Sequence, residues 1–150
     1  MDWIARLIEE YKNYITDIKS SDDGEAFVII NPFLGENIYI DLEEGELTFH
    51  FSYHHAHFGE DIKSLIDYID DFLRNKLVVF EFYEGDFCFW SGARGQEDID
   101  LSSGESALRS VTKDELSLWE HYYNLLKGVD CRCSIRSWDS LLNKDMDFTL

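Results

Sequence analysis

Residues 38–51 read IYIDLEEGELTFHF, and this stretch decides the fold. Apolar and polar residues alternate on both sides of a Glu-Glu-Gly-Glu turn, in which Gly45 can adopt a positive φ. Such a period of two is typical of strands that bury one face. The stretch therefore predicts a β-hairpin. Its inner face carries Ile38, Ile40, Leu42, Leu47, Phe49 and Phe51.

Further strands and helices are predicted on either side of this hairpin. The apolar run Phe27–Ile30 predicts a strand before it, and residues 53–57 prolong its second strand through His55 and His57. Apolar residues at three- and four-residue spacing predict helices over residues 2–18 and 62–73. In the second of these, Asp70 and Arg74 have the spacing of an ion pair.

The remaining chain predicts a second hairpin and a third helix. Residues 77–83 and 86–91 form the hairpin, with Phe82 facing Phe87 across a two-residue turn. Thr112 and Glu115 match a capping box that opens a helix ending near Gly128. Residues 131–150 alternate weakly and add one or two strands.

These elements predict one α+β domain over residues 1–150. Short turns join neighbouring strands, so we expect a mostly antiparallel sheet of about five to seven strands. About three helices should pack mainly on one face of that sheet, which leaves the other face at least partly open.

The net charge is the outstanding feature of the composition. Thirty-one Asp and Glu against thirteen Lys and Arg give a net charge of −18. Such a surface repels nucleic acid and anionic membranes, so we expect neither as a partner. It attracts basic proteins and raises their association rate.

Targeting and redox signals favour a cytoplasmic protein. The chain begins with an amphipathic pattern rather than a signal peptide, and it lacks an apolar run long enough to span a bilayer. Three cysteines form no disulfide framework, so we expect reduced thiols.

Histidines and cysteines supply the candidates for metal chemistry. His55 and His57 point to the same side of a strand, and Cys131 and Cys133 share that spacing. If the two strands paired, a zinc site would be conceivable. A half-buried strip of imidazoles and aromatic rings explains the pattern better, so we expect no cofactor.

Catalytic motifs are not recognisable in the sequence. Glu60 or Asp61 could orient His57 as a general base, and Arg132 could lower the pKa of a neighbouring thiol. Nucleophile elbows, phosphate loops and dinucleotide fingerprints are missing. We therefore expect a binding protein rather than an enzyme.

Acidic clusters next to tryptophans are the expected partner-binding residues, because aromatic anchors dominate the energy of protein interfaces. The candidates are Glu43, Glu44, Glu46, Asp67, Asp70, Asp71, Trp90, Glu97, Asp98, Asp100 and Trp138.

Part of the chain resembles a group of small, uncharacterised bacterial proteins. The resemblance lies in residues 47–90, under a third of the chain: His55-Ala-His57-Phe58, an acidic helix, Asn-Lys-Leu-Val-Val at 75–79 and a Tyr-Glu-Gly turn at 83–85. The group typically has a tryptophan before the first of these histidines, where this chain has His54. Such proteins are similar in size and charge to immunity proteins of bacterial polymorphic toxin systems.

The resemblance and the charge together predict an immunity-type protein that neutralises a basic toxin, such as a nuclease, by occluding its active site. Two alternatives remain open. One is a solitary bacterial domain with a structural or regulatory role, whose acidity serves solubility. The other is a metal-binding protein centred on His55 and His57.

Overall fold

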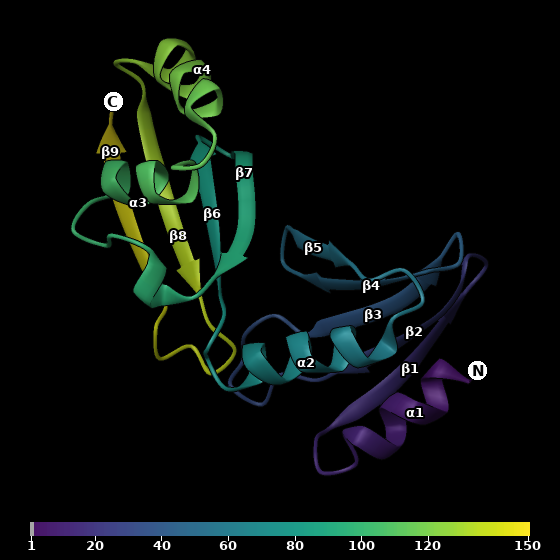
Figure 1. Cartoon of the computed structure of the whole chain (residues 1–150). Coiled ribbons are helices and arrows are strands. Elements are labelled where there is room, and N and C mark those ends of the chain that lie inside the picture. Colours follow the sequence, from purple (N-terminus) through teal and green to yellow (C-terminus); the bar gives the residue numbers. More distant parts are fainter. Residues whose placement is uncertain (1) are drawn as a thin grey trace. The chain divides into compact units, whose positions relative to one another are not determined.

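The computed structural model describes residues 2–150, which form two compact units (Figure 1). The first extends to Asn75 and includes Trp138–Ser140, and the second contains Lys76–Ser137 and Leu141–Leu150. Each unit has its own antiparallel sheet and its own helices, which confirms the α+β class and the antiparallel pairing. The nine strands of the described chain are divided between two sheets, rather than the one sheet of five to seven that we expected.

The first unit is built on a five-stranded antiparallel meander in the order β1-β2-β3-β4-β5. Its elements are α1 (Trp3–Glu10), β1 (Thr16–Ser21), β2 (Gly24–Ile29), β3 (Ile38–Glu43), β4 (Glu46–Phe51), β5 (His54–His57) and α2 (Ile62–Leu73).

Both helices of this unit pack against the same face of the sheet. Tyr11, at the end of α1, lies against Phe27 of β2, with 6.5 Å between ring centroids. Phe72 of α2 lies 5.6 Å from Phe49 and 4.6 Å from Phe51 of β4. All five side chains are buried, so the alternating apolar residues of the meander form the core beneath the helices.

The first helix is much shorter than the predicted 2–18. It ends at Glu10, and Thr16–Ser21 instead forms edge strand β1, paired with β2. Ile15 and Ile18 fit helical spacing but are β-branched, and Ile18 lies opposite Phe27 in the sheet. Strand pairing therefore overrides a periodicity that local sequence cannot resolve.

The hairpin at residues 38–51 is confirmed, but its second strand stops earlier than predicted. Glu44 and Gly45 both have positive φ, as a tight hairpin turn requires. A second tight turn follows at Ser52, also with positive φ, so His54–His57 returns as β5 against β4. His54 consequently faces the core, where its Nε2 lies 2.6 Å from the Tyr68 hydroxyl.

The second unit has a four-stranded antiparallel sheet in the order β7-β6-β8-β9. Its elements are β6 (Val78–Glu84), β7 (Phe87–Arg94), η1 (Gln96–Asp98), α3 (Gly104–Val111), α4 (Leu116–Leu126), β8 (Asp130–Arg136) and β9 (Lys144–Thr149). The predicted 77–91 hairpin and the terminal strands are thus confirmed.

The register of the β6–β7 hairpin differs from the prediction. Glu84, rather than Phe82, pairs with Phe87, and a bulge then places Phe82 opposite Trp90. A one-residue shift turns a side chain to the other face of a sheet. Phe82 accordingly lies in the core, whereas Phe87 is 68% exposed.

The predicted capping box is wrong, because it overlooks helix α3. Thr112 follows the last residue of α3 as its C-cap, and its hydroxyl donates to the Leu108 carbonyl oxygen at 2.7 Å. Ser103 caps the start of α3 by accepting from the Ser106 amide. Helix α4 then begins at Leu116 without a side-chain cap, and Gly128 follows its end with the expected positive φ.

Candidate functional site

The face of the five-stranded sheet opposite α1 and α2 is the candidate functional site. We call it the histidine face; its residues are Tyr39, Asp41, Glu46, Thr48, His50, His55 and His57. They alternate with the core residues of β3, β4 and β5, so the pleat of the sheet directs them away from the helices.

Cross-strand register arranges the histidine face in two rows. In one row Tyr39 lies opposite His50, which lies opposite His55. In the other, Asp41 lies opposite Thr48, which lies opposite His57. Three imidazoles from two strands are thereby brought together with carboxylates from β3 and β4.

Two of the imidazoles are held by carboxylates. His50 Nε2 lies 3.2 Å from Asp41 Oδ2, and His57 Nδ1 lies 3.3 Å from Glu46 Oε2. His57 Nδ1 is also 3.3 Å from the Thr48 hydroxyl. The sequence suggested Glu60 or Asp61 as the partner of His57, but Asp61 instead caps α2 by accepting from the Ser64 amide.

The third imidazole lies next to both of the others. The ring of His55 is 5.1 Å from that of His57 and 6.4 Å from that of His50, measured between centroids. The side chain of His55 is exposed, and those of the two carboxylate–imidazole pairs are between a third and a half exposed. The imidazoles and carboxylates are therefore accessible, whereas Thr48 between Asp41 and His57 is buried, and a surface of exposed acidic and imidazole groups suits binding.

One edge of the histidine face continues into a cluster of carboxylates, which we call the acidic end. The β1–β2 and β3–β4 turns and the strand ends beside them line a shallow hollow of about 530 Å³ there. The acidic residues lining the hollow are Asp23, Glu25, Asp41, Glu43 and Glu44, with Lys19 beside them. Glu43 also lies opposite Glu46, so two like charges face each other at this edge of the sheet.

The charge of the protein is concentrated in this unit. The first unit has eighteen Asp and Glu against five Lys and Arg, a net charge of −13. The second has thirteen against eight, a net charge of −5. The predicted cluster at Glu43, Glu44 and Glu46 therefore lies in the more acidic half of the molecule.

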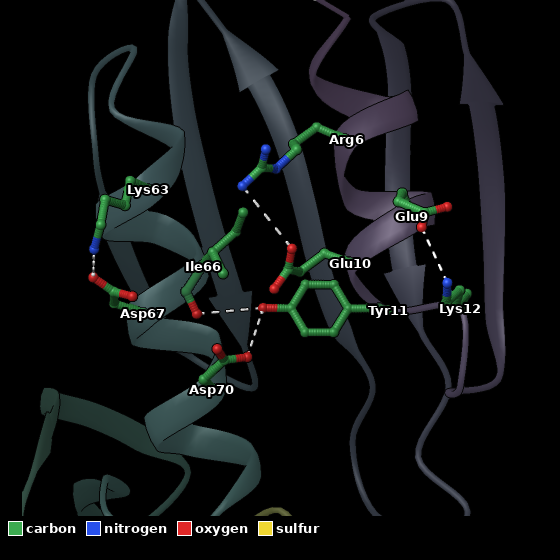
Figure 2. A network of polar contacts seen from close by, with 9 residues as sticks. All are labelled: Arg6, Glu9, Glu10, Tyr11, Lys12, Lys63, Ile66, Asp67 and Asp70. Atoms are coloured by element: carbon green, nitrogen blue, oxygen red, sulfur yellow. Dashed lines mark hydrogen bonds and ion pairs between the residues drawn. The ribbon is translucent and has the colours of Figure 1, made fainter.

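The predicted cluster on α2 is largely engaged within the protein (Figure 2). Asp67 accepts from Lys63 at 2.8 Å. Tyr11 donates its hydroxyl to Asp70 Oδ1 at 3.0 Å, so Asp70 joins α2 to α1 instead of pairing with Arg74. Asp71 is only partly exposed, which leaves α2 a weaker candidate than the acidic end.

The third predicted cluster, Glu97, Asp98 and Asp100, lies in the second unit and is exposed. Glu97 and Asp98 belong to η1. Asp100 accepts from the Ser102 amide at 3.0 Å, and this contact lowers the pKa of its carboxyl. This cluster therefore belongs to a different unit from the histidine face.

Neither predicted tryptophan is a free anchor. Trp138 is 3% exposed, and its ring lies 6.4 Å from that of Phe72. Trp90 is partly buried against Phe82, with 5.7 Å between centroids, and Arg94 stacks over it at 5.4 Å. Trp138 belongs to the core of the first unit, so its predicted role at an exposed interface is wrong.

The zinc site considered from sequence loses its geometric basis. β5, which holds His55 and His57, pairs with β4, whereas β8, which holds Cys131 and Cys133, pairs with β6 and β9. Residues 2–150 contain no group of three or more His, Cys, Asp or Glu arranged to hold a metal ion.

The pKa of each of the three thiols is raised above its ordinary value. Burial, reinforced by Asp145, raises the pKa of Cys133 to about 12. Burial and Glu84 raise the pKa of Cys131, and burial and Glu81 raise that of Cys88. Because the thiolate is the reactive form, these shifts oppose the lowered pKa that Arg132 suggested.

Sequence reasoning missed Tyr39, Asp41, Thr48 and His50 as members of the site. The signal was present in the alternation itself, since these residues fill the polar positions between Ile38 and Phe51. Their partners could not be read from the chain, because the turn at Ser52 sets which histidine lies opposite which residue of β4.

Comparisons of the whole chain with known proteins found no match. No protein-family model, curated protein or solved structure matches the chain. Among residues 2–150, no helix combines the length and the apolar character that crossing a bilayer requires.

Proposed function

We propose that this chain is an immunity-type binding protein that neutralises a basic protein, such as a toxin with nuclease activity. The histidine face and the acidic end form the docking surface. The observation that carries the proposal is the net charge of −13 on the unit whose sheet has one face free of its own helices.

The mechanism is occlusion. A basic active site that accommodates phosphates presents Lys and Arg side chains, and the carboxylates of the acidic end match these charges. Charge complementarity of this kind raises the association rate and excludes partners of the wrong sign. The hollow at the acidic end is open and is lined mainly by residues at the ends of β1, β2 and β3. Steric blocking by the whole sheet face is therefore how binding would inhibit the partner.

The aromatic contribution to this interface comes from Tyr39 rather than from Trp90 or Trp138. Tyr39 is partly exposed at the centre of the outer face, and Lys19 lies over its ring at 5.7 Å. A cationic side chain of a partner could replace Lys19 there, because the face of an aromatic ring attracts cations.

The test is binding of the purified chain to the product of its neighbouring gene. We expect a complex with a dissociation constant in the nanomolar range or below that weakens when salt rises from about 0.05 M to 0.5 M, because salt screens the charges that guide encounter.

Two charge-reversal variants locate the interface. Glu43→Lys combined with Glu44→Lys changes the acidic end, and Glu97→Lys combined with Asp98→Lys makes the same charge change in η1 of the second unit. The first pair should weaken binding about 100-fold or more and the second less than about fivefold, by the usual contrast between charges inside an interface and charges outside it. Equal effects of the two pairs, or affinity that is indifferent to salt, would contradict the proposal.

A further inference from the structure

We propose that the histidine face is a pH-sensitive switch that releases a cationic partner when the pH falls below neutral. This inference rests on the proposed function and adds its regulation. It is carried by three imidazoles that share one open face with the carboxylates of the docking surface.

The geometry makes protonation act directly on the acidic groups. His50 and His57 already lie 3.2 and 3.3 Å from Asp41 and Glu46. When these imidazoles become protonated, each contact becomes an ion pair that neutralises a carboxylate. Two of the negative charges that face a partner are thus cancelled from within the protein.

His55 adds a repulsive element to this switch. Its ring lies 5.1 Å from His57 and 6.4 Å from His50. Protonation of all three would place an additional positive charge between two others on an exposed surface. A basic partner then meets the charge of His55 beside two ion pairs in which the carboxylates are already neutralised.

The charged groups that face the three histidines are of both signs. β1 contributes Asp17 to the row of Tyr39, His50 and His55, and Lys19 to the row of Asp41, Thr48 and His57. β3 and β4 contribute Asp41, Glu43 and Glu46. Four carboxylates and one ammonium group therefore flank the three imidazoles on this face.

The remaining two histidines provide internal controls. His54 faces the core of the first unit and is 8% exposed, whereas His121 is exposed on α4 of the second unit. His121→Gln therefore removes an exposed imidazole from the protein without touching the histidine face.

The experiment measures binding of a synthetic peptide of about ten lysines, which represents the chemistry of a basic partner. Isothermal titration at constant low salt gives its affinity at pH 8, 7, 6 and 5.5. For the wild-type protein and for His121→Gln we expect affinity to fall about tenfold or more between pH 8 and pH 5.5, through the three added charges.

The decisive variant combines His50→Gln, His55→Gln and His57→Gln. The readout is the ratio of its own affinities at the two pH values: between pH 8 and pH 5.5 this variant should lose less than about threefold, whatever its affinity at pH 8. Circular dichroism at each pH checks that the triple variant is folded. If the triple variant is unfolded, the single variant His55→Gln, which changes an exposed side chain, is used in its place. A fall in affinity that is the same with and without these histidines would overturn the switch and leave the proposed function intact. Absence of peptide binding at pH 8 would instead overturn the acidic docking surface and the switch with it.

Discussion

The two units share an architecture and differ in how they use charge. Each has an antiparallel sheet with two α-helices, but the first has a net charge of −13 and the second −5. In the second unit, four cations lie over aromatic rings: Arg94 over Trp90, Arg109 over Trp119, Lys127 over Tyr123 and Arg132 over Tyr83. In the first unit the corresponding contact is Lys19 over Tyr39.

This difference shows that the composition of the whole chain hides a local contrast. Cations of the second unit cover aromatic surface and balance its acids, whereas the sheet of the first unit leaves carboxylates and imidazoles facing outward. A uniform net charge would serve solubility. A charge concentrated around one sheet face favours a docking surface. How far that face depends on the hydrophobic core beneath it can be tested.

The largest expected effect comes from removing a buried aromatic ring from the core beneath the histidine face. Phe72→Ala deletes the ring that contacts Phe49, Phe51 and Trp138 in the first unit. We expect a loss of about 3–5 kcal/mol in unfolding free energy, from lost burial and a cavity. Chemical denaturation followed by tryptophan fluorescence measures it.

The matched control for this change is Phe87→Ala in the second unit. Phe87 is 68% exposed, so the same chemical deletion should alter stability by about 0.5 kcal/mol or less. If both variants lost the same stability, the assignment of Phe72 to a packed core and Phe87 to the surface would be wrong.

A smaller effect tests close packing in the second unit. Gly104 begins α3, and a methyl group added there would overlap the ring of Phe148. Gly104→Ala should therefore cost about 1–3 kcal/mol through displacement of that ring, although alanine favours helices. Thermal unfolding compares it with Ser117→Ala at an exposed position of α4, which should be neutral or slightly stabilising. A gain in stability for Gly104→Ala would show that α3 does not approach β9 so closely.

The smallest expected effect at neutral pH concerns the junction of α1 with α2. Tyr11→Phe removes the hydrogen bond to Asp70 shown in Figure 2 and should cost about 1–2 kcal/mol at pH 7. Urea denaturation measures the loss, with Tyr14→Phe as the control on a side chain that is 45% exposed.

The same pair of variants has a signed dependence on pH. Burial first, and then Asp70, raise the pKa of Tyr11 above its ordinary value. The folded state therefore keeps this proton when the unfolded chain loses it, so the stabilisation is fully present below about pH 10 and declines above that by about 1.4 kcal/mol per pH unit. The difference in unfolding free energy between the wild-type protein and Tyr11→Phe should therefore shrink by at most about 1.4 kcal/mol as the pH rises from 10 to 11. An advantage that grew with pH would contradict the buried neutral hydroxyl.

Local sequence patterns predicted the elements whose signals were strong and self-consistent. The hairpin around Gly45 and helix α2 are confirmed because alternation, turn residues and helical spacing agree there with the tertiary fold. The failures share a different feature. At Ile18, Phe87 and Thr112 the local pattern was compatible with two structures, and pairing or packing with distant residues selected one of them.

The sequence by itself determined the α+β class, the antiparallel pairing and the total charge, because these follow from residue spacing, short turns and composition. Only the tertiary structure decided how the strands divide between two sheets and where the acids gather. It also decided that Asp41 and Glu46 meet His50 and His57, and that Trp138 is buried. The physical reason is that side-chain direction depends on strand register, and register is set by a few turn residues together with the burial of an entire sheet face.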